Sequence, residues 1–157
     1  MSKAFKFLVS SLSNAGKTTL TAELTDTLVI SHDGKTYPYA VPHTNVGPFE
    51  RTAELKAIII QKVQAYEERF GKLPKRLVID TVSKIFDTLM DSCNNRYKNF
   101  EIYSQLNKEI HEFTDFIEQD IIGAGISVIL LSHAVWKEED SQYILVGKGK
   151  NNCPIAA

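Results

Sequence analysis

The fold is decided by residues 5–20, which read FKFLVSSLSNAGKTTL. Residues 5–10 begin with alternating polar and apolar positions and end apolar, which predicts a strand buried on both faces. Gly16-Lys17-Thr18 comes next, and helix-forming residues continue to about Leu24. A strand, a short loop and a helix start in this order gather backbone N–H groups and the positive end of a helix around one point. That arrangement suits a bound phosphate.

The loop in this segment carries a phosphate-binding pattern. Residues 11–18 match GxxxxGK[ST] at the last three positions, while Ser11 stands where the pattern begins with glycine. Gly16 lets the backbone approach a phosphate, the Lys17 ammonium reaches the β- and γ-phosphates, and the Thr18 hydroxyl ligates Mg²⁺. A plain helix start capped by threonine is the alternative. We predict that ATP and Mg²⁺ bind here, through Ser13, Asn14, Ala15, Gly16, Lys17, Thr18 and Thr19.

An acidic residue ends the next strongly apolar segment, Arg76-Leu77-Val78-Ile79-Asp80. A carboxylate at the end of a buried strand beside the phosphate loop is placed to hold Mg²⁺ through water, opposite Thr18. We therefore predict Thr18 and Asp80 as the metal-binding pair. The alternative is that Asp80 only caps the following helix.

Polar groups also end the apolar run of residues 126–131, where Ser132 and His133 follow. Ligands of open α/β sheets lie at the carboxyl ends of the strands, so these groups are expected to face the γ-phosphate; capping a turn is the alternative. Hydrolysis also needs a group that positions water. Glu50 and Glu54 are the carboxylates in a suitable region, although acidic residues at a helix start are favourable without catalysis. The candidate catalytic residues are Lys17, Asp80, Ser132 and Glu50.

Hydrophobic periodicity predicts the remaining helices. One stripe runs to a cap at Gly71, a short helix lies within residues 81–100, and the clearest helix covers 102–121. Strands alternating with helices predict an α/β fold of three layers, with a mostly parallel sheet and helices on both faces. We expect one domain over residues 1–150 and a short tail at 151–157.

A second short strand is predicted at residues 28–31, before a turn at Asp33-Gly34. Asp-Gly supplies the positive φ of a tight hairpin, so residues 37–41 are expected to return as an antiparallel strand. Pro38 and Pro42 restrict that strand to the edge of the sheet.

The composition is that of a globular protein: 157 residues, 43% hydrophobic, with 18 basic against 19 acidic side chains and a net charge of −1. A protein-wide basic field for nucleic acid is therefore absent. Cys93 and Cys153 form no metal or disulfide pattern, and His32, His43 and His111 are expected in solvent. No apolar run is long enough to span a bilayer, so we expect no membrane partner and a reducing, cytoplasmic environment.

With the loop, Asp80 and the polar strand end in this order, residues 5–146 resemble the RecA-like P-loop ATPases. The closer resemblance is to compact phage-type nucleotide-binding ATPases, some of which act in single-strand annealing. It implies ATP hydrolysis, homo-oligomers on single-stranded DNA, and a role in phage or bacterial DNA recombination, replication or repair. The family's loop lysine and threonine match Lys17 and Thr18, its acid matches Asp80, and its polar sensor matches Ser132, with His133 as a second candidate.

The resemblance also implies two mobile loops that contact single-stranded DNA, here residues 81–100 and 134–150. Basic side chains suit the DNA backbone and aromatic rings suit the bases. The candidate DNA contacts are Arg96, Lys98, Trp136 and Lys137. The acidic run at 138–140 opposes DNA, so the residues alone favour a solvated loop.

Two other functions stay open. One is a small-molecule phosphotransferase such as a nucleoside or nucleotide kinase, in which the acidic strand is the direct neighbour of the phosphate-loop strand. RecA-like ATPases place the sensor strand between the two. The other is a nucleotide-binding module without catalysis, because no residue is marked by the sequence as the water-positioning base.

Overall fold

The structure, a computed structural model, describes residues 3–12, 16–32, 34, 37, 41–137 and 142–145. Strands and helices alternate along much of the described chain. They are β1 (Lys6–Ser11), α1 (Lys17–Ala22), β2 (Thr27–Ser31), β3 (His43–Asn45), α2 (Thr52–Phe70), β4 (Arg76–Asp80), α3 (Val82–Arg96), α4 (Glu101–Asp115) with a π-helical continuation (Phe116–Ile121), β5 (Ser127–Lys137) and β6 (Gln142–Leu145).

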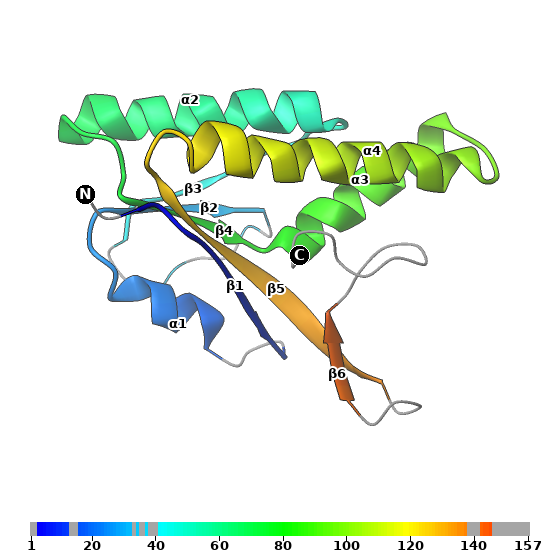
Figure 1. The fold of residues 1–157 in the computed structure, drawn as a ribbon, viewed down its shortest axis with the longest axis horizontal. Helices are drawn as coiled ribbons and strands as arrows, with labels where there is room; N and C mark the ends of the chain where they lie inside the picture. The colour runs from blue at the N-terminus through cyan, green and yellow to red at the C-terminus, as the bar shows by residue number, and fades with distance from the viewer. Residues whose placement is uncertain are drawn as a thin grey trace.

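The described strands form a parallel sheet in the order β1-β5-β4-β2-β3, and β6 pairs antiparallel with the far end of β5 (Figure 1). β5 therefore separates β1, which precedes the phosphate loop, from β4, which ends at Asp80. In the register, Ser11 pairs with His133 and Asp80 pairs with Leu131. The strand order is the one expected of RecA-like ATPases and differs from the order expected of the kinase alternative.

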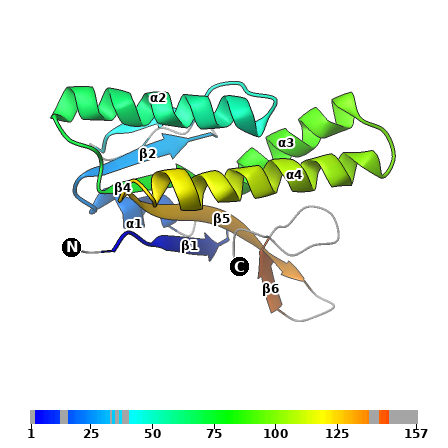
Figure 2. The same cartoon turned by 45° about the horizontal axis from the view of Figure 1, so that its top comes forward.

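Helices cover both faces of the sheet, as Figures 1 and 2 show: α2, α3 and α4 lie on one face and α1 on the other. Parallel strands need crossover connections, and the intervening helices supply them. The predicted α/β fold with a mostly parallel sheet and three layers is confirmed.

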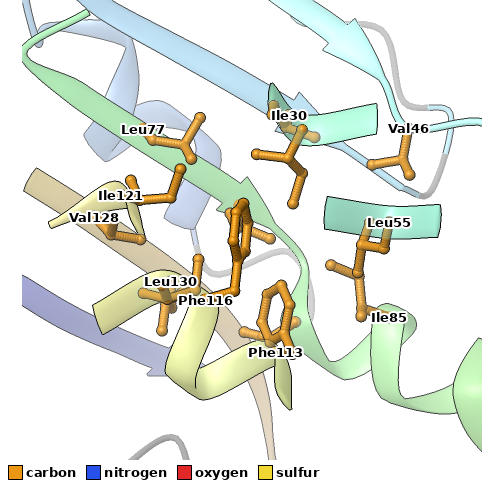
Figure 3. Close-up of a cluster of buried hydrophobic side chains, with 14 of the residues drawn as sticks. Ile30, Val46, Leu55, Leu77, Ile85, Phe113, Phe116, Ile121, Val128 and Leu130 are labelled. Carbon is orange, nitrogen blue, oxygen red and sulfur yellow. The ribbon is translucent and has the colours of Figure 1, made fainter. Parts of the chain in front are cut away.

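The larger core lies between the sheet and helices α2–α4. Alternate strand residues, among them Leu77 and Leu130, point into it and meet Phe113 and Phe116 from the end of α4 (Figure 3). Phe86 and Phe113 pack edge to face with ring centroids 6.4 Å apart. Removing such large side chains from water supplies about 1.5–3 kcal/mol each, so this face carries most of the stability.

The face covered by α1 has a smaller core, built from strand residues such as Val29, Val78 and Leu131. α1 is only six residues long, so it leaves part of this face uncovered. On β1, at one edge of the described sheet, Phe5 and Phe7 remain about half exposed, at 49% and 56%.

Helix α2 is capped by another helix. Its N-cap residue, Arg51, makes no side-chain capping bond. Instead, Glu109 of α4 accepts the Thr52 N–H through Oε2 at 2.7 Å, and its carbonyl accepts the Thr52 hydroxyl at 2.8 Å. A carboxylate at the positive end of a helix is stabilising, so this contact both starts α2 and fixes it against α4. The predicted cap at the other end, Gly71, has φ 71° and is confirmed.

The predicted hairpin after residue 31 is wrong. β3 begins beyond Pro42 and runs parallel to β2, so the segment between them is a crossover rather than a tight turn. Pro42 has no N–H to donate, but its carbonyl accepts the Val29 N–H at 2.9 Å, immediately before the ladder. Of the predicted return strand, Pro38 and Tyr39 lie outside the described residues.

The described parts of the two segments expected as mobile loops hold regular structure instead. Residues 82–96 form α3, which is longer than the predicted short helix: Thr81 caps it by accepting the Lys84 N–H, and Ile85, Phe86 and Leu89 are buried along one stripe. β5 does not end at Ser132 but continues to Lys137, because β6 pairs with this extension. Local capping and strand pairing thus override the loop expected from the resemblance.

Candidate functional site

The carboxyl edge of the sheet presents polar residues to both faces. Successive strand residues alternate between faces, so Ser11, His133, Asp80 and Ser31 share the face of the smaller core, where α1 lies. Neighbouring strands are about 4.8 Å apart, so Ser11 and Asp80 are separated by about 10 Å across the strands, and Ser11 also lies two residues further along its strand than Asp80. This row is the candidate site.

Lys17 is held at the mouth of the phosphate loop. Although charged, it is only 8% exposed. Its ammonium donates to the carbonyl of Ser11 at 3.1 Å, to the Ser11 hydroxyl at 2.9 Å and to the carbonyl of Leu12 at 2.9 Å. Neutral acceptors satisfy the buried charge, and charged phosphate oxygens are stronger acceptors than carbonyls. The ammonium is thus positioned where a phosphate can compete for it.

Gly16 precedes Lys17 in a left-handed conformation with φ 85°, as the N-cap of α1. A Cβ built at this position meets nothing within 4 Å. Glycine is therefore needed here for the positive φ, which turns the chain from the loop into the helix, rather than for space. Its carbonyl accepts the Leu20 N–H at 3.1 Å, which closes the first turn.

Asp80 supplies the carboxylate of the row and is buried, at 1% exposure. Tyr37 donates its phenolic hydrogen to Asp80 Oδ2 at 2.8 Å, and Tyr37 itself packs against the smaller core. The main chain is fixed as well, because the Asp80 carbonyl accepts the His32 N–H at 2.9 Å. A carboxylate oriented by a phenol and by the backbone is a rigid oxygen donor.

Ser132 points to the opposite face from Asp80. It is 3% exposed, and its Oγ lies 3.1 Å from the Oγ of Ser83 in the first turn of α3. Ser83 also accepts the His133 N–H at 3.0 Å. The alternation of β5 brings His133, and not Ser132, to the face of Asp80.

Glu50 lies with the α2–α4 layer. Its N–H donates to Glu54 Oε2 at 2.9 Å, and its carbonyl accepts from Arg96 at 3.3 Å. It lines a cavity of about 260 Å³ with Phe49, Thr88, Ser92, Asn95 and Arg96. The structure therefore brings Glu50 together with α3, on the other side of the sheet from Lys17 and the Asp80 carboxylate.

His32 is not simply solvated as expected. Its ring is half-buried, with Nε2 at 2.7 Å from the Thr88 hydroxyl and the ring centroid 5.0 Å from that of Phe49. His43 is exposed, as expected, and its Nδ1 is 2.9 Å from the Val41 carbonyl.

Several of the predicted site residues, or their side chains, lie outside the part of the chain that the structure describes. Ser13, Asn14 and Ala15 are outside the described residues, as are the side chains of Thr18, Trp136 and Lys137; Thr19 is exposed in the first turn of α1. Arg96, a candidate DNA contact, ends α3 with its guanidinium on Ser92 and the Glu50 carbonyl. Lys98 is exposed just beyond it.

The polar side chains of the row suit Mg²⁺ better than a metal ion whose ligands all come from the protein. Within the described part of the chain, no group of three or more His, Cys, Asp or Glu side chains is placed to hold a metal ion. Mg²⁺ is bound through one or two carboxylates together with substrate phosphates and water, which fits a single buried Asp80 beside a phosphate loop.

The fold and the row of polar groups define the class of P-loop nucleotide-binding proteins. Residues 3–146 match a family model described as an AAA domain, and the chain belongs to this family of nucleotide-binding ATPases. No curated protein matches the chain. Among the described residues, the helices are all too short or too polar to cross a bilayer.

Two residues of the site were missed in the sequence. Tyr37 lies where the return strand of the hairpin is predicted to begin, and nothing in its neighbourhood indicates that it reaches Asp80. Ser83 is one of several serines, and only the register of β5 against β4 shows that it faces His133. Both contacts are long-range in sequence, so local patterns do not report them.

Proposed function

We propose that this chain binds ATP with Mg²⁺ at the carboxyl edge of the sheet and hydrolyses it as a RecA-like ATPase. The observation that carries the proposal is that the Lys17 ammonium contacts Ser11 at the end of β1 while Asp80 ends β4, on the same face of the sheet and with β5 between the two strands. Membership of the family indicates nucleotide binding in general. The choice of ATP as substrate, of Mg²⁺ as metal ion, and the hydrolysis itself are what we propose.

Each group has a role that its geometry supports. Lys17 would exchange its Ser11 and Leu12 acceptors for β- and γ-phosphate oxygens, and the loop residues 13–16 are the others that we propose to bind the phosphates. Asp80 and Thr18 are the residues that would hold Mg²⁺, which would neutralise phosphate charge. His133, on the face of Asp80, replaces Ser132 as the residue we propose to contact the γ-phosphate.

The strand order favours hydrolysis over the kinase alternative. An inserted strand between the phosphate-loop strand and the acidic strand presents polar groups between Lys17 and Asp80, where the γ-phosphate lies. A kinase of this type has the two strands adjacent and needs arginines over the phosphates. Arg96 instead donates hydrogen bonds to the Ser92 hydroxyl and to the Glu50 carbonyl.

Single-stranded DNA is the partner we propose for this ATPase. The support is the extension of β5 beyond His133, which connects the candidate sensor to a strand pair carrying Trp136 and Lys137, together with the exposed Lys98. Phosphate release measured with and without single-stranded DNA tests this proposal. A rate that DNA leaves unchanged at low salt, together with no retention of DNA, would reject the partner and leave the ATPase intact.

Lys17→Ala tests the nucleotide site. Loss of a charged hydrogen-bond donor removes about 1.5–3 kcal/mol, so the affinity for ATP with Mg²⁺ should fall about ten-fold or more in a calorimetric titration. Lys6→Ala is the control, since Lys6 lies at the start of β1, away from the loop, and forms an ion pair with Glu118. Equal affinities for wild type and Lys17→Ala would contradict the assignment.

A further inference from the structure

We propose that Ser83 is a positioning residue that ties the start of α3 to the end of β5 and so holds His133 in place. The inference rests on the proposed ATPase function for its effect on turnover, but the tie itself is a feature of the fold. Ser83 belongs to none of the motifs described above.

The need for Ser83 arises from where β4 stops. The ladder between β4 and β5 ends at the pair Asp80–Leu131, because the chain turns after Asp80 into α3. β5 continues past this point, so His133 lies beyond the last pair of the β4–β5 ladder. There the Ser83 hydroxyl accepts the His133 N–H at 3.0 Å and provides a hydrogen-bond acceptor beyond the end of β4.

The hydroxyl hydrogens complete a small ring. A serine hydroxyl has one hydrogen to donate and can accept from others. With the His133 N–H donated to Ser83, the Ser83 hydroxyl donates to Ser132 Oγ at 3.1 Å. The Ser132 hydroxyl in turn reaches the His133 carbonyl at 3.4 Å. Ser83 and Ser132 are 6% and 3% exposed, so water competes poorly for these bonds.

The ring connects the two ends of the candidate site. Ser83 follows Asp80 after one capping residue, Thr81, and Val82, so it moves with the segment that carries the acidic group. On the other side it holds the peptide of His133, whose side chain lies on the face of Asp80. The Ser83–His133 bond therefore links the segment after Asp80 to β5, which continues into the β5–β6 pair (Figure 1).

Ser83→Ala, compared with two control variants, tests the proposal. Ser127→Ala removes a hydroxyl that also accepts a backbone N–H, that of Phe5, but at the opposite end of β5. Ser132→Ala removes one member of the ring and leaves the Ser83–His133 bond. Three quantities are measured on the full chain: hydrogen exchange of the His133 amide without nucleotide, the affinity for ATP with Mg²⁺, and kcat for phosphate release.

In Ser83→Ala, exchange of the His133 amide should accelerate about ten-fold and kcat should fall about ten-fold, with nucleotide affinity unchanged within about two-fold. Ser127→Ala should leave kcat and the His133 amide unchanged, and Ser132→Ala should have an intermediate effect. Wild-type exchange at His133 in Ser83→Ala, or equal losses of kcat in Ser83→Ala and Ser127→Ala, would overturn the positioning role. A wild-type protein without turnover would reject the ATPase, while the exchange comparison would still decide whether Ser83 holds β5.

Discussion

At the scale of single residues, the site is defined by buried charges that have neutral partners. Lys17 donates to two carbonyls and a hydroxyl, and Asp80 accepts from a phenol. Hydrogen bonds of this kind satisfy a charge that is removed from water. A triphosphate and its metal ion would meet groups that are already oriented.

Tyr37→Phe removes a single hydroxyl from this arrangement. Since hydrogen bonds to charged groups contribute about 1.5–3 kcal/mol, the free energy of unfolding should fall by about that amount when measured in urea. The same substitution in an Asp80→Ala background should have a much smaller effect, because the acceptor has gone. Additive losses in the double variant would show that the phenol and the carboxylate do not interact.

At the scale of elements, helix ends are fixed by side chains from other parts of the chain. The start of α2 relies on Glu109 of α4, whereas the start of α3 is capped locally by Thr81. Sequence patterns do not distinguish these two cases. Periodicity locates both helices, because buried stripes repeat every three or four residues. The start of α2 depends on a contact across the fold, which no local pattern contains.

Glu109→Ala should lower the free energy of unfolding by about 1–2 kcal/mol, because the Thr52 N–H loses a charged acceptor at a helix start. Glu109→Gln keeps an oxygen at the same place and should lose less. Glu112→Ala is the control on the same helix: its ion pair with Lys56 is largely exposed, and such pairs contribute little. Equal stabilities for Glu109→Ala and Glu112→Ala, compared by thermal unfolding, would contradict the capping role.

The errors made from the sequence share a cause. Asp33-Gly34 has the composition of a hairpin turn, yet the neighbouring strand β3 is parallel, because Pro42 and the pairing of His43 with Val29 set the register. The strands before the phosphate loop and before Asp80 were predicted well, since an apolar run that ends in a polar group is a local signal. Which of Ser132 and His133 shares the face of Asp80 depends on the register of β5 against β4, which only the assembled sheet determines.

At the scale of the whole molecule, the main core and the site lie on different faces of one sheet. Helices α2–α4 bury the larger cluster, in which Cys93 is fully buried. The site occupies the thinner face, where α1 gives partial cover. Substitutions at the site are therefore expected to leave the main core folded.

The reactivity of the Cys93 thiol can be used to follow the unfolding of the larger core. Burial raises the pKa of its thiol, with the nearby Arg96 opposing the shift to a smaller extent. Because the folded pKa lies above the unfolded one, the fold favours the protonated thiol; stability is lost as pH rises through the unfolded pKa towards the folded one. In a Cys153→Ser background, a disulfide reagent should label Cys93 only on unfolding, and faster labelling should follow added urea. Rapid native labelling near neutral pH would contradict the burial of this thiol.

The position of β1 at one border of the sheet has a consequence for the order in which the protein comes apart. β1 is joined to the sheet by a single ladder, whereas β4 and β5 are each joined on two sides. Peeling β1 away breaks that one ladder, and it dismantles the nucleotide loop while the helical layer stays intact. A nucleotide that bridges Lys17 and Asp80 would hold β1 to the rest of the sheet, so it should suppress this local opening well before it raises resistance to global unfolding.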